Sequence, residues 1–205
     1  MKVYEPILYA CIYLGLTNEI LELEEIKADF ETCNHPLNNG NIEVQQLSEE
    51  QKTLFFMLQH ACFAVEEMAC DYLPLFHNQT IFSDDDCQIL FSAFDKPIRG
   101  IKHVKHGGTK CTFNDYVTFL KVGCKNEPYE IEYAYYPAMP TSFVQEFETH
   151  PIVSARILAY KIASDYCLSK SLFDESVMWD KRYNESMNFL KNKLSEKRLK
   201  NFELY

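Results

Sequence analysis

The chain has little glycine, a single tryptophan and no long apolar run. Six glycines in 205 residues leave few of the tight backbone turns that many nucleotide sites use. There is no Gly-rich phosphate loop and no Gly-x-Ser-x-Gly elbow, since the pair Gly107-Gly108 fits a hairpin turn. No apolar run reaches about 18 residues, the length of a membrane-spanning helix. We therefore expect neither a nucleotide-binding loop nor a membrane span.

Basic residues are also in short supply. Lysine and arginine number 20 against 30 aspartate and glutamate residues, which gives a formal net charge of −10. An acidic surface does not hold phosphate backbones by counterion release, so we expect no specific nucleic-acid binding. Passing contact with DNA that must not stick remains compatible with this charge. Residues 191–200 reverse the sign locally, either as a solvated helix end or as an arm that docks on an acidic partner.

The eight cysteines form no Cys-x-x-Cys pair. Several lie among apolar residues, where a free cysteine behaves as a small hydrophobic side chain. The segment Met1–Pro6 has no long apolar core, so we expect no secretory signal. Together these features predict free thiols in a reducing compartment.

Hydrophobic periodicity predicts an α+β fold. Apolar spacing predicts helices over 3–14, 17–30, about 48–72, 151–171 and from about 174 to 194. The longest of these begins with Ser48-Glu-Glu-Gln51, a capping box. Residues 150–195 are expected to form an antiparallel helical hairpin. The predicted architecture is a helical bundle, with a long central helix and this hairpin, carrying an inserted small antiparallel β-sheet.

The inserted sheet is expected between residues 80 and 137. Strands are predicted near 81–82, 89–94, 98–104, 116–122 and 129–136, in one sheet of about four to six strands. Strand alternation places Tyr129, Tyr133 and Tyr135 on one face and Tyr136 on the other. Aromatic side chains often serve interfaces, and a core rich in aromatics is the alternative. The interface candidates are Tyr129, Tyr133, Tyr135, Tyr136, Phe202 and Tyr205.

The domain boundaries follow from these elements. We expect one domain over 1–205, with N-terminal helices in 1–79, the β insertion in 80–137, the helical hairpin in 150–195 and a flexible tail in 196–205. The tail is expected to order only on assembly.

Three groups of residues offer chemistry, and none has a known signature. His103, His106, Cys111 and Cys124 have the right side chains for zinc but not a zinc-ligand spacing. Asp84-Asp85-Asp86 lacks the alternation and the glycine of a calcium loop, so a solvated turn is favoured. The thiols lack a nucleophile motif, and Glu66 and Glu67 fit an exposed helix flank. We predict no catalytic residue, no metal and no cofactor.

Six short motifs carry a resemblance to a known family. A Tyr-Tyr-Pro strand end precedes an alanine-rich helix that ends in tyrosine, and an Asp-Glu-x-x-x-Trp-x-x-x-Tyr helix follows. The residues concerned are Tyr133–Pro137, His150–Ile152, Ile157–Leu168, Phe173–Trp179 and Arg182–Met187, with Ala10–Leu16 near the start. In these motifs and in element order the chain resembles the head–tail connector proteins (adaptor, or tail-tubular-A-like proteins) of tailed bacteriophages. The cysteine-rich sheet and the loop at 31–47 depart from the commoner pattern.

The resemblance implies a structural role in the virion. Such proteins form a ring, usually twelvefold, between the portal and the tail, around a channel through which genomic DNA passes. The implied partners are further copies of the chain, the portal protein and tail or further ring proteins. Synthesis would take place in the host cytoplasm. Another kind of protein-binding module remains the main alternative, and a small thiol- or zinc-dependent enzyme is the third.

Overall fold

The chain divides into two compact units, each with a hydrophobic core of its own. The computed structural model describes residues 1–38 and 43–202, with side chains up to residue 194. The helical unit is discontinuous and consists of Met1–Leu73 and Ala138–Tyr205. The sheet unit is the segment between them, Pro74–Pro137. The insertion therefore begins earlier than the predicted residue 80, because its first strand already begins at Leu75.

The first half of the helical unit contains three α-helices. Helix α1 spans Tyr4–Leu14 and ends at Gly15, whose φ of 70° suits a residue without a side chain. Helix α2 spans Thr17–Ala28. After the short helix η1 (Val44–Gln46), helix α3 spans Glu49–Glu67 and continues as the π-helical turn η2, Met68–Tyr72. The predicted capping box is confirmed.

The second half contains the predicted helical hairpin. Helix α4 spans Ala155–Ser169 and helix α5 spans Phe173–Phe202. The prediction that Pro151 opens the third main helix is wrong. Pro151 lies in a turn closed by the Val153 N–H, which donates to the His150 carbonyl at 2.9 Å. Ser154 is extended, so the helix begins only at Ala155.

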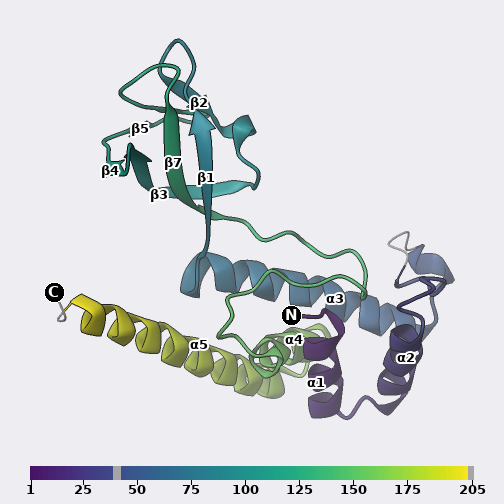
Figure 1. The fold of residues 1–205 in the computed structure, drawn as a ribbon. Helices are drawn as coiled ribbons and strands as arrows, with labels where there is room; N and C mark the ends of the chain where they lie inside the picture. The colour runs from purple at the N-terminus through teal and green to yellow at the C-terminus, as the bar shows by residue number, and fades with distance from the viewer. Residues whose placement is uncertain (39–42, 203–205) are drawn as a thin grey trace. The chain divides into compact units, whose positions relative to one another are not determined.

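Helix α4 contacts α1, α3 and α5 within this unit (Figure 1). Its buried alanines, Ala159 and Ala163, let the neighbouring helices approach closely. Tyr13 of α1, Tyr160 of α4 and Trp179 of α5 stack on one another, with ring centroids 5.3 to 5.9 Å apart. Offset-stacked rings add to the stabilisation that burial alone provides. The hairpin is thereby fastened to the N-terminal helix.

The sheet unit contains two antiparallel sheets where one was predicted. The larger has the strand order β1-β7-β3-β4 and the smaller has the order β2-β6-β5. Their bounds are Leu75–Phe82 (β1), Gln88–Leu90 (β2), Ile98–His106 (β3), Thr109–Lys110 (β4), Asn114–Asp115 (β5), Phe119–Lys121 (β6) and Pro128–Tyr135 (β7). The strand predicted over 89–94 stops at Leu90, and the 3-10 turn η3 (Phe91–Ala93) follows.

The two sheets share one core because each has a single apolar face. The larger sheet contributes residues from β1, β3 and β7, and the smaller contributes Ile89 and Leu120, with Val122 next to it. Strand β7 lies in the middle of the larger sheet, paired with β1 over its whole length from Leu75↔Tyr135 to Phe82↔Pro128. Gly107 and Gly108, both with positive φ, form the predicted hairpin turn between β3 and β4.

The predicted fold class is confirmed. The described chain has five α-helices and two small antiparallel sheets, with about 47% helix and 19% strand. It is an α+β fold with an inserted β element. Across residues 1–38 and 43–202, no helix is both long enough and apolar enough to cross a membrane.

The capping box gives a direct test of the α3 boundary. Replacing Ser48 by alanine removes the acceptor of the Gln51 N–H, 3.2 Å away, and is expected to lower the free energy of unfolding by about 1 kcal/mol. The matched control is Ser154→Ala at the start of α4, where the side chain makes no capping hydrogen bond. Chemical denaturation of both variants measures the difference, and equal losses would contradict the assignment.

Candidate interaction surfaces and polar networks

The structure places the candidate interface tyrosines in different environments. Tyr129 and Tyr133 are 1% and 0% exposed in the core of the sheet unit. The Tyr129 hydroxyl accepts from the Cys124 N–H at 2.8 Å, and the Tyr133 hydroxyl donates to Gln79 Oε1 at 3.2 Å. Both rings are therefore packed inside the sheet unit, where a second chain cannot contact them. The strand alternation that made them interface candidates identifies the face of β7 that points into the core.

The remaining interface candidates are more open or fall beyond the described side chains. Tyr135 is half-buried, with Lys96 Nζ 4.3 Å from its ring centroid. Tyr136 is 40% exposed. Phe202 is the last residue of α5, and its side chain lies outside the described part, as does the whole of Tyr205. Of the predicted flexible tail, 196–202 belongs to helix α5 and 203–205 lie outside the described residues.

Two of the four zinc candidates, His106 and Cys111, have other side-chain contacts in the sheet unit. The His106 ring stacks on Tyr129 at 5.1 Å, and its Nε2 lies 3.8 Å from Glu127. His103 stands opposite Glu132 in the sheet register. The Cys111 thiol donates to the Thr109 carbonyl at 3.4 Å. Among the residues that the structure describes, no three His, Cys, Asp or Glu side chains are placed to hold a metal ion.

The acidic run at 84–86 is an exposed turn. Asp84 Oδ1 accepts the N–H groups of Asp86 and Gln88, at 3.0 and 2.7 Å. Asp85 accepts from the Asn126 side chain at 2.8 Å. The three carboxylates therefore do not converge on one point, and Asp84 acts as the turn-forming residue that its type favours.

Burial makes the helical thiols poor nucleophiles. Burial is the main cause that raises the pKa of Cys11 to about 12 and the pKa of Cys62 to about 11. Burial, followed by the nearby Glu175, also raises the pKa of Cys167. A thiol reacts as its thiolate, so these three side chains stay protonated at neutral pH and serve as packing.

A charged cluster joins α3, α4 and α5. Lys161 Nζ lies 3.3 Å from Glu67, 3.8 Å from Asp165 and 3.5 Å from Asp180. Burial alone would lower the pKa of Lys161, but the three carboxylates more than compensate and raise it. His60 Nδ1 also lies 3.2 Å from Asp165. Lys161 thus links the three helices, and Glu67 is one of its ion-pair partners.

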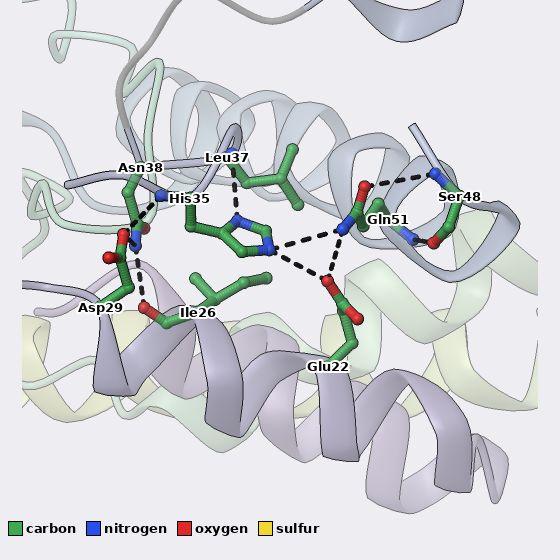
Figure 2. Close-up of polar contacts among 8 residues, drawn as sticks. All are labelled: Glu22, Ile26, Asp29, His35, Leu37, Asn38, Ser48 and Gln51. Carbon is green, nitrogen blue, oxygen red and sulfur yellow. Dashed lines mark hydrogen bonds and ion pairs between the residues drawn. The ribbon is translucent and has the colours of Figure 1, made fainter. Parts of the chain in front are cut away.

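A second polar network fixes the segment that leaves α2 (Figure 2). The Leu37 N–H donates to His35 Nδ1 at 3.2 Å, which places the ring proton on Nε2. The His35 Nε2–H group donates to Glu22 Oε1 at 3.0 Å, and Gln51 Nε2 donates to the same oxygen at 2.7 Å. Because Gln51 also belongs to the capping box of α3, Glu22 joins α2, the loop and α3.

Asp29 holds the other end of the same loop. Its carboxylate accepts from the Thr32 hydroxyl, from the His35 N–H at 2.6 Å and from Asn38 Nδ2 at 3.2 Å. These hydrogen bonds, that of Thr32 foremost, lower the pKa of Asp29 from 3.8 to about 2. These contacts hold the loop that follows α2.

One exposed apolar surface of the helical unit lies at the turn between α4 and α5. We call it the turn patch; it consists of Leu168, Leu172, Phe173 and Val177, which are 54%, 45%, 62% and 68% exposed. Phe173 and Val177 are one helical turn apart, off the buried stripe that contains Trp179 and Tyr183. Clustered exposed apolar side chains mark interaction sites in soluble proteins. The sequence showed the break near residue 172, but not that these side chains are left uncovered.

No protein-family model matches the chain, and a search of the curated proteins finds no similar sequence.

The Asp29 network predicts a pH-dependent contribution to stability. A carboxylate with a lowered pKa stabilises the fold fully above its unfolded pKa, and the contribution is lost as pH falls through the folded value. Asp29→Asn should therefore unfold more easily than the wild type at pH 7, and the difference should shrink between about pH 4 and pH 2. Urea titrations at several pH values measure it, with the exposed Asp115→Asn as control. A difference that is constant with pH would contradict the network.

Thiol accessibility gives an independent prediction. Cys33 and Cys124 are exposed, whereas Cys11, Cys62 and Cys167 are buried. Alkylation of the native protein at pH 8, followed by peptide mass spectrometry, should modify the first two and spare the other three until denaturant is added. Modification of Cys11 as fast as Cys33 would show that the α1–α3 packing is wrong.

Proposed function

We propose that this chain is a structural virion protein, a subunit of the head–tail connector ring that joins the portal to the tail around the DNA channel. The observation that carries the proposal is the turn patch. It lies within the helical hairpin, the same segment in which the connector-like motifs are concentrated. An interaction surface and a family resemblance thus coincide in one element.

The chemistry of the turn patch suits a contact between protein subunits. Apolar side chains at its centre are bordered by charged ones, with Lys170 and Asp174 beside it in sequence and Lys181 paired to Glu185 at 3.9 Å further along α5. Interfaces combine an apolar centre with a polar rim. A closed ring requires that such a patch meet a different surface of the next subunit.

The net charge supports the placement around DNA. A wall that carries excess negative charge repels phosphate and lets DNA slide past without binding. The chain's charge of −10 fits that requirement, and the partners on this proposal are further copies of the chain, in a ring of about twelve by family resemblance, together with the portal and tail proteins.

A binding module outside the connector is the second candidate, and the turn patch supports it equally. The two differ in the partner, since only a connector subunit must assemble on a portal. A thiol- or zinc-dependent enzyme has less support, because Cys11, Cys62 and Cys167 are buried and the described residues contain no group of three metal-ligating side chains.

The test is assembly on a cognate portal protein, followed by electron microscopy. Wild-type protein should add a ring to the portal, while the variant Phe173→Asp, Val177→Glu should bind at least about tenfold more weakly. Both changes suit the first turns of a helix, where negative charge is favourable. The control is Phe189→Glu, which removes another exposed apolar side chain of α5.

The outcomes separate the candidates. Loss of the ring in the double variant, with the control unaffected, supports the proposal. Absence of any ring with the wild type, or a ring that the double variant forms as well as the wild type, contradicts it.

A further inference from the structure

Strand β1 has one paired edge and one open edge. It is the terminal strand of the larger sheet and pairs only with β7. Apart from β7, no segment in the described residues makes a backbone hydrogen bond with Leu75–Phe82. An eight-residue strand therefore presents a row of unpaired N–H and C=O groups, which can pair with another chain.

This edge lacks the features that normally prevent such pairing. Natural edge strands carry lysine, proline, inward-pointing charges or bulges. Strand β1, Leu-Phe-His-Asn-Gln-Thr-Ile-Phe, contains no lysine, arginine, aspartate, glutamate, proline or glycine. Strand β3 on the other side of the sheet has two register irregularities and several basic residues. The sheet thus has one protected side and one that is open.

The outward side chains of β1 include two exposed phenylalanines. Phe76 and Phe82 are 38% and 67% exposed, and Asn78 and Thr80 lie between them on the same face. Gln79, on the opposite face, bonds to the segment after η3, donating to the Ala93 carbonyl at 3.2 Å and accepting from the Asp95 N–H at 3.0 Å. The inner face is occupied. On the outer face, Lys102 Nζ lies 4.2 Å from the centroid of the Phe76 ring, and Phe82 is the more exposed of the two phenylalanines.

The pattern of β1 is self-complementary. When two copies of the strand run antiparallel about a two-fold axis at Gln79, Phe76 of each copy stands opposite Phe82 of the other. Asn78 then stands opposite Thr80. Cross-strand aromatic pairs and polar pairs stabilise antiparallel sheets, and no charged residue opposes another. A register displaced by two residues would place a phenylalanine opposite a polar side chain.

We propose that β1 is a strand-addition site whose occupant is β1 of a second copy of this chain, in this register. The two larger sheets join into one continuous antiparallel sheet through an isologous contact. This contact is separate from the connector role, because an isologous pair forms a dimer and does not close a ring. It is carried by the sheet unit alone, without the turn patch.

The test is the concentration dependence of the mass of the full-length protein, measured by sedimentation velocity under reducing conditions. Two double variants are compared, and they differ only in the residue introduced at position 78. Asn78→Lys with Thr80→Lys places introduced lysines opposite each other across the two-fold, whereas Asn78→Glu with Thr80→Lys places opposite charges there. Within its own sheet, residue 78 neighbours Glu132 and residue 80 neighbours Glu130, so the added lysines stand opposite carboxylates. The glutamate introduced at position 78 stands opposite Glu132, which Lys102 neutralises at 2.6 Å.

We expect wild type to dimerise, the double-lysine variant to dimerise at least about tenfold more weakly, and the Glu/Lys variant to stay within about threefold of wild type. The control is Val117→Lys. Val117 is 94% exposed and lies before β6, so this variant should dimerise as the wild type does. Circular dichroism checks that each variant is folded.

Three results would overturn the proposal. If the wild type stays monomeric at every concentration, β1 does not pair with a second copy of the chain. Equal weakening by both double variants excludes the register centred on Gln79. Loss of dimerisation in Val117→Lys moves the contact to the smaller sheet. Failure of the chain to assemble on a portal would leave this result unchanged, so the two proposals fail separately.

Discussion

The pairing of β1 with β7 is the constraint on which the rest of the structure depends. The first strand of the insertion is hydrogen-bonded to the last, with Leu75 opposite Tyr135. The chain therefore leaves the helical unit and returns to it at neighbouring points. The cores reflect this closure, because the residues of each core come from one unit alone.

The second half of the chain completes the helical unit, and polar side chains link the helices where they meet. Helix α4 contacts three other helices, and the lysine on it, Lys161, is surrounded by carboxylates from α3, α4 and α5. At the opposite end of α3, Glu22 and Gln51 tie α2 to the capping box. Truncating one partner of such a network leaves a buried polar group unpaired, which costs more than the bond contributes. These networks favour one arrangement of the helices, whereas the turn patch and the open edge of β1 are exposed in the described part of the chain.

Features set by neighbouring residues were predictable from the sequence. The Ser48–Gln51 capping box, the end of α1 at Gly15 and the Gly107-Gly108 turn each depend on the conformational preferences of a few residues. The class and the order of elements followed from periodicity. The start of α4 was predicted too early, because a proline suits a turn as well as a first helical position and the extended Ser154 decides between them.

Features set by distant residues were not predictable. Alternation showed that Tyr129 and Tyr133 share a face, but whether that face is open depends on the smaller sheet, which packs against it with Ile89 and Leu120. The turn patch and the open edge of β1 are exposed because no described segment packs on them, and a local sequence pattern does not predict such exposure. The His35 network joins residues of α2, the loop and α3, whose proximity follows only from the packing of the helices.

The most direct test of this account is the amide NMR spectrum of the fragment Pro74–Pro137 expressed alone. Closure by β1 and β7 predicts a folded fragment with dispersed resonances and cross-strand contacts between Leu75 and Tyr135 and between Phe82 and Pro128. A collapsed spectrum, typical of an unfolded chain, would contradict the claim that the insertion has a core of its own.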